Sequence, residues 1–431
     1  MRLFTIAIIG IFLTACGTKK NISEPASMPR AASTPTEKVK MVTPLTDDQL
    51  KEKAAVLAHK FMITDGHVDL PYRLKIKNFK LEKEFLGIPI ETDDGDFDYV
   101  RAKKGGLDVP FMSVYIPASY QKTGGAKSFA DSIINMINGI TDAHPDKFAT
   151  CNSVAEAIEN TKIDLISLPM GMENGAGIED DITNVKYFYK RGIRYITLTH
   201  SLDNLICDSS YDTTGTWGGL SPFGREVVAE MNNVGIMVDI SHVSDNTFYQ
   251  VMEQTEVPCI ASHSSCRKYT PGFERNMNDD MIKKLAENNG VIQINFGSTF
   301  LDKKIRDDFD EKRAYILNLV QEKGIEISSD EGQALIAKLR KENPILFSDV
   351  EMAFRHIDHV VQLVGPDHVG FGSDFDGVGD SLPTGLKDVS QYPNLIYLML
   401  KNGYSETDIE KVCSGNVLRV WKAVEAYASS H

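Results

Sequence analysis

The sequence predicts an α/β fold, a (β/α)8 TIM barrel with an α-helical insertion between its seventh and eighth strands. Two observations favour this fold. Short, continuous apolar runs rich in β-branched residues recur along the 431-residue chain, as is typical of strands buried on both faces of a parallel sheet. Amphipathic segments lie between these runs, and about eight such strand–helix units close a barrel. We therefore expect one barrel over residues 45–427.

The first 44 residues are not expected to belong to the barrel. Arg2 is followed by an apolar run over residues 3–13, which is too short to cross a bilayer as a helix. The run ends in Leu13-Thr14-Ala15-Cys16, which resembles a bacterial lipoprotein lipobox, with a plain secretory peptide as the alternative. We expect a lipoprotein signal peptide over residues 1–16 and lipidation at Cys16. Residues 17–44 are then a flexible tether, and the protein is exported and lipid-anchored to a bacterial membrane, on its periplasmic or cell-surface side.

The barrel strands are predicted in order from the apolar pattern. Residues 46–49 resemble a capping box, so a helix over Leu50–Phe61 leads into a short first strand that ends at Ile63. The other seven strands are expected at Leu107–Ile116, Ile163–Met172, Ile193–Leu198, Gly235–Ile240, Pro258–Ala261, Val291–Phe296 and Val369–Gly372.

Helical patterns fill the intervals between the strands, most clearly at Pro222–Asn233 and Asp279–Glu287. The interval before the eighth strand is unusually long. Its residues 300–346 are charged and helix-forming, with helices expected at Arg313–Gln321 and Glu331–Leu339. This insertion either covers one edge of the barrel mouth or only solvates its rim.

Charge and cysteine usage exclude two kinds of protein. The net charge of −14 leaves no basic stripe that could neutralise phosphates, so we expect no nucleic-acid partner. Five widely spaced cysteines beyond Cys16 do not form a disulfide scaffold. Cys259 and Cys266 flank His263, which suggests a zinc site, but Cys259 lies in an apolar strand and a buried structural role is favoured.

Residue types that bind metals follow the predicted strands. His67 and Asp69 stand two residues apart, so their side chains point the same way in an extended segment. In a barrel the strand ends meet on one face, where such enzymes do their chemistry. The residues at these ends are His67, Asp69, Glu173, His200, His242, His263 and Asp374.

This set suits two divalent ions a few ångströms apart, which need imidazole and carboxylate ligands and one carboxylate that bridges. His67 and Asp69 suit one ion, His242 and His263 suit the other, and Glu173 can span both. A water molecule held between two such ions loses its proton near neutral pH and becomes a nucleophile.

Such a site also needs a group that stabilises an oxyanion and a group that donates a proton to a leaving nitrogen. His200 and Asp374 remain at suitable strand ends for these two tasks.

The segments that contain these residues resemble the membrane (renal) dipeptidase family of zinc peptidases. The resemblance runs from Ile63 to about Trp421. It rests on Asp65-Gly66-His67-Val68-Asp69, Ser113-Val114-Tyr115, Thr197-Leu198-Thr199-His200-Ser201, Gly219-Leu220-Ser221-Pro222-Phe223-Gly224, His242-Val243-Ser244, Ser262-His263-Ser264-Ser265, Arg275-Asn276 and Gly370-Phe371-Gly372-Ser373-Asp374-Phe375-Asp376-Gly377.

The resemblance implies a binuclear zinc dipeptidase that acts on dipeptide substrates. It implies that His200 binds the substrate carbonyl, that Arg275 binds the substrate carboxylate and that Asp374 transfers a proton. It also implies two zinc ions per chain, held by His67, Asp69, Glu173, His242 and His263.

The sequence departs from the family pattern at several places. The 300–346 insertion is longer than in the mammalian type, which puts substrate preference and dimer geometry in doubt and leaves a homodimer open. Asn174 follows the expected bridging glutamate where a glycine is commoner, and Leu202 stands where the mammalian form has a disulfide cysteine. His356 and His359 lie in the helical stretch 350–364 and are interpreted as packing or surface residues.

Three hypotheses follow. The leading one is a lipid-anchored binuclear zinc dipeptidase. The second is a related metal-dependent amidohydrolase that acts on another amide, a lactam or an ester. Arg275 favours the dipeptide, since a bidentate carboxylate clamp is wasted on a neutral ring. The third is a non-catalytic surface binding lipoprotein, which the loss of any one metal ligand would support.

Overall fold

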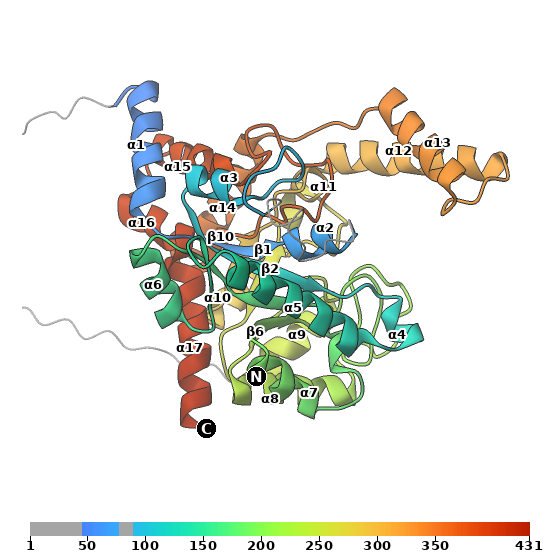
Figure 1. Ribbon diagram of the computed structural model, residues 1–431, viewed down its shortest axis with the longest axis horizontal. Coiled ribbons are helices and arrows are strands. Elements are labelled where there is room, and N and C mark those ends of the chain that lie inside the picture. The colour runs from blue at the N-terminus through green and yellow to red at the C-terminus, as the bar shows by residue number, and fades with distance from the viewer. Residues whose placement is uncertain (1–44, 77–88) are drawn as a thin grey trace, which may run out of the picture. The chain divides into compact units, whose positions relative to one another are not determined.

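Eight parallel strands close into a barrel in the computed structural model, which describes residues 45–76 and 89–431 (Figure 1). The strands follow one another around the barrel in the order β1-β10-β9-β8-β7-β6-β5-β2. The predicted (β/α)8 barrel is therefore confirmed, whereas the predicted lipobox and tether lie outside the described residues. The strands are β1 (Ile63–Val68), β2 (Leu107–Tyr115), β5 (Met170–Glu173), β6 (Ile193–Thr197), β7 (Met237–Asp239), β8 (Ile260–Ser264), β9 (Val291–Ile294) and β10 (Val369–Phe371).

Helices cover the barrel and connect its strands (Figure 1). No helix among residues 45–76 and 89–431 is both long enough and apolar enough to cross a membrane. The α-helices are α1 (Asp47–Lys60), α2 (Leu70–Ile76), α3 (Tyr99–Gly105), α4 (Tyr120–Thr123), α5 (Ala126–Ala143), α6 (Val154–Lys162), α7 (Thr183–Lys190), α8 (Pro222–Val234), α9 (Asp245–Gln254), α10 (Asp279–Glu287), α11 (Ser298–Leu301), α12 (Lys303–Glu322), α13 (Asp330–Glu342), α14 (Val350–Val364), α15 (Tyr392–Lys401), α16 (Glu406–Glu410) and α17 (Asn416–Ser430).

The predicted first strand was placed too early along the chain. The capping box is present, because the Thr46 and Gln49 side chains each accept a hydrogen bond from the other residue's backbone N–H. The helix that it begins ends at Lys60, and Phe61 is its C-cap. Strand β1 therefore begins at Ile63 rather than ending there. Asp69 lies immediately after the strand.

The predicted third strand, residues 163–172, is wrong as a single element. Ile163 caps α6, and the remaining residues form β4 (Ile166–Leu168) and then β5. Strand β4 leaves the barrel and pairs with β3 (Phe148–Thr150) in a separate two-stranded sheet. Pro169 separates β4 from β5, and its lack of an N–H breaks a continuous ladder at that point.

The C-terminal helix packs against side chains inside the barrel. Val417, Val420, Trp421 and Val424 of α17 belong to one buried cluster with inward-facing residues of the strands, among them Val109, Phe111, Tyr195, Met237, Ile260 and Val291. The ring centroids of Phe111 and Trp421 lie 5.2 Å apart. This apolar packing fills the barrel interior beneath the polar side chains at the carboxyl ends of the strands.

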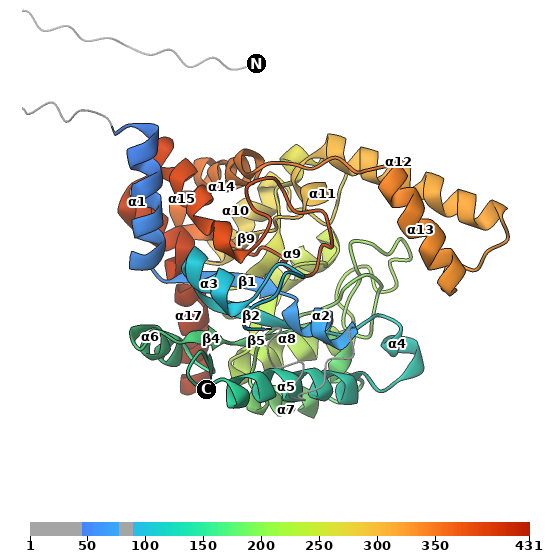
Figure 2. The ribbon, with the colours of Figure 1, turned by 45° about the horizontal axis from the view of Figure 1, so that its top comes forward.

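The insertion between β9 and β10 forms a helical hairpin that extends away from the barrel in both views (Figures 1 and 2). Its helices α12 and α13 contain the two predicted segments, although α12 begins ten residues before Arg313, at Lys303. A small core of its own joins the two helices, formed by Ile316, Val320 and Ile336. The hairpin is thus a separate structural addition with its root at the barrel mouth.

His356 and His359 are packing residues, within the alternatives expected for them. Both are buried on α14. The Nδ1 atom of His356 accepts a hydrogen bond from the backbone N–H of Cys266, and its Nε2 donates to the carbonyl of Leu301. Cys259 and Cys266 are buried free thiols, as are the other three described cysteines, so the structural interpretation of these residues agrees with the geometry.

Candidate metal centre

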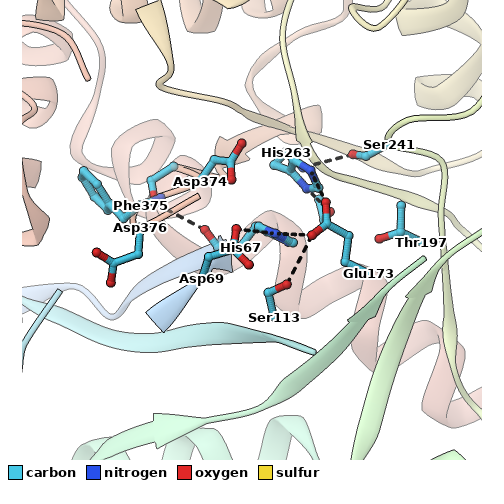
Figure 3. Close-up of polar contacts among 12 residues, drawn as sticks. His67, Asp69, Ser113, Glu173, Thr197, Ser241, His263, Asp374, Phe375 and Asp376 are labelled. Atoms are coloured by element: carbon cyan, nitrogen blue, oxygen red, sulfur yellow. Dashed lines mark hydrogen bonds and ion pairs between the residues drawn. The ribbon is translucent and has the colours of Figure 1, made fainter. Parts of the chain in front are cut away.

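The carboxylate of Glu173, at the end of β5, lies at the centre of the polar strand ends (Figure 3). Its Oε1 atom is 3.1 Å from His242 Nε2 and 3.4 Å from His263 Nε2. Its Oε2 atom is 3.5 Å from His67 Nε2 and accepts a 3.4 Å hydrogen bond from Ser113 Oγ. The two oxygens therefore face two different sets of imidazole nitrogens.

Three groups of side chains could each hold a metal ion, and they share members. The ligand atoms of each group all lie within 4.8 Å of one another. Glu173 belongs to two of the groups and His67 to two, so neighbouring ions could share a ligand. The groups are His67 with Glu173 and His263, Glu173 with His200 and His242, and His67 with Asp69 and Asp374.

The donor atoms fit divalent metal ions. His67 Nε2 and Asp69 Oδ1 are buried and have no hydrogen-bond partner within the described ranges, although buried polar atoms are otherwise almost always paired. The Nε2 atoms of His242 and His263 lie only 2.9 Å apart, beside the same carboxylate. Imidazole nitrogens with carboxylate oxygens are the donor set that zinc takes in catalytic sites.

The electrostatics of the site favour the metal-binding forms of His242, His263 and Glu173, whereas Tyr195, Asp69 and Glu173 outweigh burial and raise the pKa of His67 well above its usual value. Burial, together with the Arg275 guanidinium, lowers the pKa of His242 well below its ordinary value. Burial and the nearby His67 lower the pKa of His263 to about 3. Burial raises the pKa of Glu173, but the surrounding imidazoles, His67 first, outweigh it and hold the pKa well below its usual range. Neutral imidazoles and an ionised carboxylate are the forms that coordinate metals.

Side chains inside the barrel orient His67. Its Nδ1 atom lies 2.7 Å from the hydroxyl of Tyr195, which stands on β6. Gly171 makes room for this contact, since a Cβ atom there would lie 1.9 Å from the Tyr195 ring. With Nδ1 held, Nε2 is the nitrogen that faces Glu173 and Asp69.

A second network orients His263. Its Nδ1 atom lies 2.7 Å from Ser262 Oγ, and that hydroxyl donates to Asp239 Oδ2 at 2.6 Å. Asp239 also accepts a hydrogen bond from Thr197 Oγ1. Sequence reasoning missed Tyr195 and Asp239. The only signal for them is a polar side chain inside an otherwise apolar strand.

Several strand ends carry left-handed backbone conformations. His242 and Asp374 have φ values of 68° and 63°. Such conformations are uncommon outside glycine and are concentrated at functional sites, where the surrounding structure holds them. Asn174 also has a positive φ, of 77°, which explains why a glycine suits this position and why asparagine is an acceptable substitute.

Asp374 is held from two sides. Its backbone N–H donates to the carbonyl of His67 at 3.0 Å, and its Oδ2 accepts a 2.8 Å hydrogen bond from Asn295 Nδ2. Burial raises the pKa of the Asp374 carboxyl, and the neighbouring carboxylates of Asp69 and Glu173 raise it further. A carboxyl with a raised pKa is suited to carry a proton near neutral pH.

A cavity of about 690 Å³ opens above these residues. His200 faces it, with Nε2 3.6 Å from Glu173 Oε1 and the ring centroid 4.8 Å from that of Tyr115. Of the predicted site residues, Asp69, Glu173, His200, His242 and Asp374 line the cavity, together with tyrosines and insertion residues that sequence reasoning missed, namely Tyr72, Tyr115, Tyr211, Phe300, Arg306, Phe309, Asp310 and Arg313.

Arg275 does not line the cavity; it lies behind the cavity wall and is only 3% exposed. Its guanidinium donates to Ser264 Oγ at 2.7 Å and to the carbonyl of His263 at 2.8 Å. Its Nε has no partner within residues 45–76 and 89–431. The structure therefore brings the seven strand-end residues together and leaves Arg275 beside them, with its Nε unpaired among the described residues.

Comparisons with known proteins agree with this geometry. Residues 51–431 match the family model described as membrane dipeptidase (peptidase family M19). The chain is 30% identical over 382 residues to an uncharacterized dipeptidase of Schizosaccharomyces pombe. The alignment covers 86% of this chain and 82% of the relative.

Solved structures share the fold. The probable dipeptidase PvdM from Pseudomonas aeruginosa is similar with a TM-score of 0.74 at 24% identity, over 88% of this chain and 100% of that one. A metallopeptidase from Rhodobacter sphaeroides, liganded with a phosphinate mimic of the dipeptide L-Ala-D-Ala, has a TM-score of 0.68 at 23% identity, over 84% and 99%. The chain belongs to the membrane dipeptidase family, peptidase family M19, and is a hydrolase of peptide bonds.

Proposed function

We propose that this M19 enzyme is a binuclear zinc dipeptidase that hydrolyses the single peptide bond of dipeptides. The observation that carries the proposal is the position of Glu173, whose two oxygens face His242 and His263 on one side and His67 on the other. In this proposal His67 and Asp69 would hold one ion, His242 and His263 would hold the other, and Glu173 would be the ligand that both share. The presence of the whole set argues against a non-catalytic binding lipoprotein.

When bound, two such ions would activate a water molecule and polarise the scissile carbonyl. The other tasks fall to protein side chains. His200 borders the cavity next to Glu173, where an Nε2–H can donate a hydrogen bond to the oxygen that gains negative charge. Asp374 faces the same cavity with a raised pKa, so it can hold a proton and deliver it to the departing amine.

Arg275 is proposed to bind the substrate's terminal carboxylate. A guanidinium–carboxylate contact is typically worth ~1.5–3 kcal/mol, so Arg275→Ala should lower kcat/KM on Ala-Ala by roughly ten- to a hundredfold. Ala-Ala amide lacks the carboxylate, so its slow hydrolysis should change little. The test is a steady-state assay of both substrates with zinc-loaded and chelator-treated enzyme, and chelation should abolish hydrolysis of both.

Arg275 could instead have a structural role, since its guanidinium already donates to Ser264 and to the carbonyl of His263. Equal losses on the acid and the amide would mean that Arg275 only supports the end of β8. A neutral amide, lactam or ester would then become the better substrate class, as in the amidohydrolase alternative. Arg275→Lys should recover only part of the acid activity, because an ammonium cannot offer the planar fork.

We also propose that Cys16 carries a lipid and that the exported enzyme is anchored to a bacterial membrane. The support is the Leu13-Thr14-Ala15-Cys16 sequence after a short apolar run. Cys16→Ser should leave the protein soluble or unprocessed, because only the thiol accepts the lipid. Fractionation with and without detergent checks this, and unchanged membrane partitioning of the variant would refute it. Light scattering of the detergent-solubilised wild type would tell a monomer from a homodimer.

A further inference from the structure

The first helix of the insertion contributes one face to the catalytic cavity. Arg306, Phe309, Asp310 and Arg313 of α12 all line it. Their spacing of three, four and seven residues places them on one stripe of the helix. The insertion therefore covers an edge of the barrel mouth, the first of the two roles expected for it, and its side chains are available to a bound substrate.

This stripe carries a positive charge that the helix does not neutralise. Arg306 Nε lies 3.6 Å from Asp310 Oδ2, and Arg313 makes no hydrogen bond or ion pair with any described residue. Lys303 and Lys312 do not line the cavity, and each is paired with an aspartate one turn away on the same helix, at 2.5 and 2.8 Å. Two guanidiniums and one carboxylate thus face the cavity from α12.

The Arg306 and Arg275 guanidiniums each lie against one of two neighbouring phenylalanine rings. The Arg306 Cζ atom lies 3.3 Å from the ring centroid of Phe273, and the Arg275 Cζ atom lies 5.5 Å from that of Phe300. The two phenylalanine rings are neighbours, with centroids 5.7 Å apart. A guanidinium stacked on a ring keeps its N–H edges free to donate in its own plane.

We propose that α12 makes the enzyme select dipeptides with an acidic C-terminal residue, an inference that rests on the proposed dipeptidase function. With the terminal α-carboxylate at the Arg275 side of the two rings, a carboxylate on the side chain of the same residue comes next to Arg306 and Arg313. An aspartate or glutamate side chain there meets two cations, one of them without a partner. A neutral side chain of the same shape has no such gain.

The test compares Ala-Glu with Ala-Gln, which have nearly the same shape and differ in one charge. We expect wild-type enzyme to hydrolyse Ala-Glu with a kcat/KM about tenfold above that for Ala-Gln, as a charge-assisted contact at a half-exposed site supports. Arg306→Gln and Arg313→Gln should each reduce this ratio several-fold, and the double variant should bring it close to one. Added salt should reduce the wild-type ratio too, because screening weakens the contact.

The matched control is Arg340→Gln, which removes an exposed arginine from α13, outside the cavity lining, and should leave the ratio at its wild-type value. Because the readout is a ratio, a partial loss of folded enzyme does not alter it. Equal wild-type rates on Ala-Glu and Ala-Gln would overturn the inference and leave the dipeptidase function standing. A preference for Glu-Ala over Gln-Ala instead would overturn the assignment to the C-terminal residue, and hydrolysis of no dipeptide would overturn both proposals.

Discussion

Glu173→Gln should lose most of its bound zinc and lower kcat/KM by roughly a thousandfold or more, because in the proposed binuclear site two ions would lose their common anionic ligand at once and each would supply several kcal/mol of stabilisation. The amide keeps the shape of the side chain but offers one neutral oxygen. Glu173 Oε1 and Oε2 both lie within 3.5 Å of imidazole nitrogens, so in the proposed site an NH₂ group at either position would place a donor against an ion. Metal analysis of the purified variant, with a dipeptide assay, measures both effects.

Asp69→Asn is the informative comparison. The Asp69 carboxylate lies beside His67, with Oδ2 3.4 Å from Nε2, and is proposed to hold one ion instead of both, so this variant should keep more zinc than Glu173→Gln does. Glu226→Gln, on the exposed side of α8, is the matched control and should bind zinc like the wild type. A Glu173→Gln enzyme with two equivalents of zinc and full activity would show that the bridging assignment is wrong.

The parts of the fold and site that could be predicted are those encoded locally. A buried parallel strand is a short apolar run, and residues at or just beyond its carboxyl end lie on the catalytic face, so His67, Glu173 and His242 could be placed together before their distances were known. The third strand was misjudged because β4 and β5 form one apolar run, and only Pro169 marks the point where the chain leaves one sheet for the other.

The supporting residues could not be predicted because their partners are remote in sequence. Tyr195 contacts His67 across 128 residues, and Gly171 admits its ring. Arg306 and Arg313 belong to a charged helix whose composition resembles any solvated surface helix. Their place in the cavity lining is visible only in the folded protein. The same applies to Arg275, whose two occupied donors are visible only in the folded protein.

Asp374→Asn should lower kcat on dipeptides by about 10²–10⁴-fold, the usual contribution of a positioned proton donor. The amide can still accept the hydrogen bond from Asn295, so the side chain should keep its position. In the wild type, a carboxylate oxygen of Asp374 also lies within 4.8 Å of the possible metal-ligand atoms of His67 and Asp69. Loss of zinc could therefore also inactivate the variant. Zinc content therefore has to be measured together with kcat. A variant with low kcat that still binds as much zinc as the wild type would support Asp374 as the proton donor.

A thioester analogue of the dipeptide isolates the proton transfer. A departing thiolate is stable without a proton near neutral pH, whereas a departing amine is not, so Asp374→Asn should lose far less activity on the thioester than on the peptide. Asp376→Asn is the matched control. Asp376 is a buried aspartate with a similar φ of 66°, but its oxygens face the backbone N–H of Asp96 and the Arg73 guanidinium instead of the cavity. It should lower stability without separating the two substrates. If Asp374→Asn loses the same factor on both, Asp374 serves the metal site and the proton for the departing amine comes from another group.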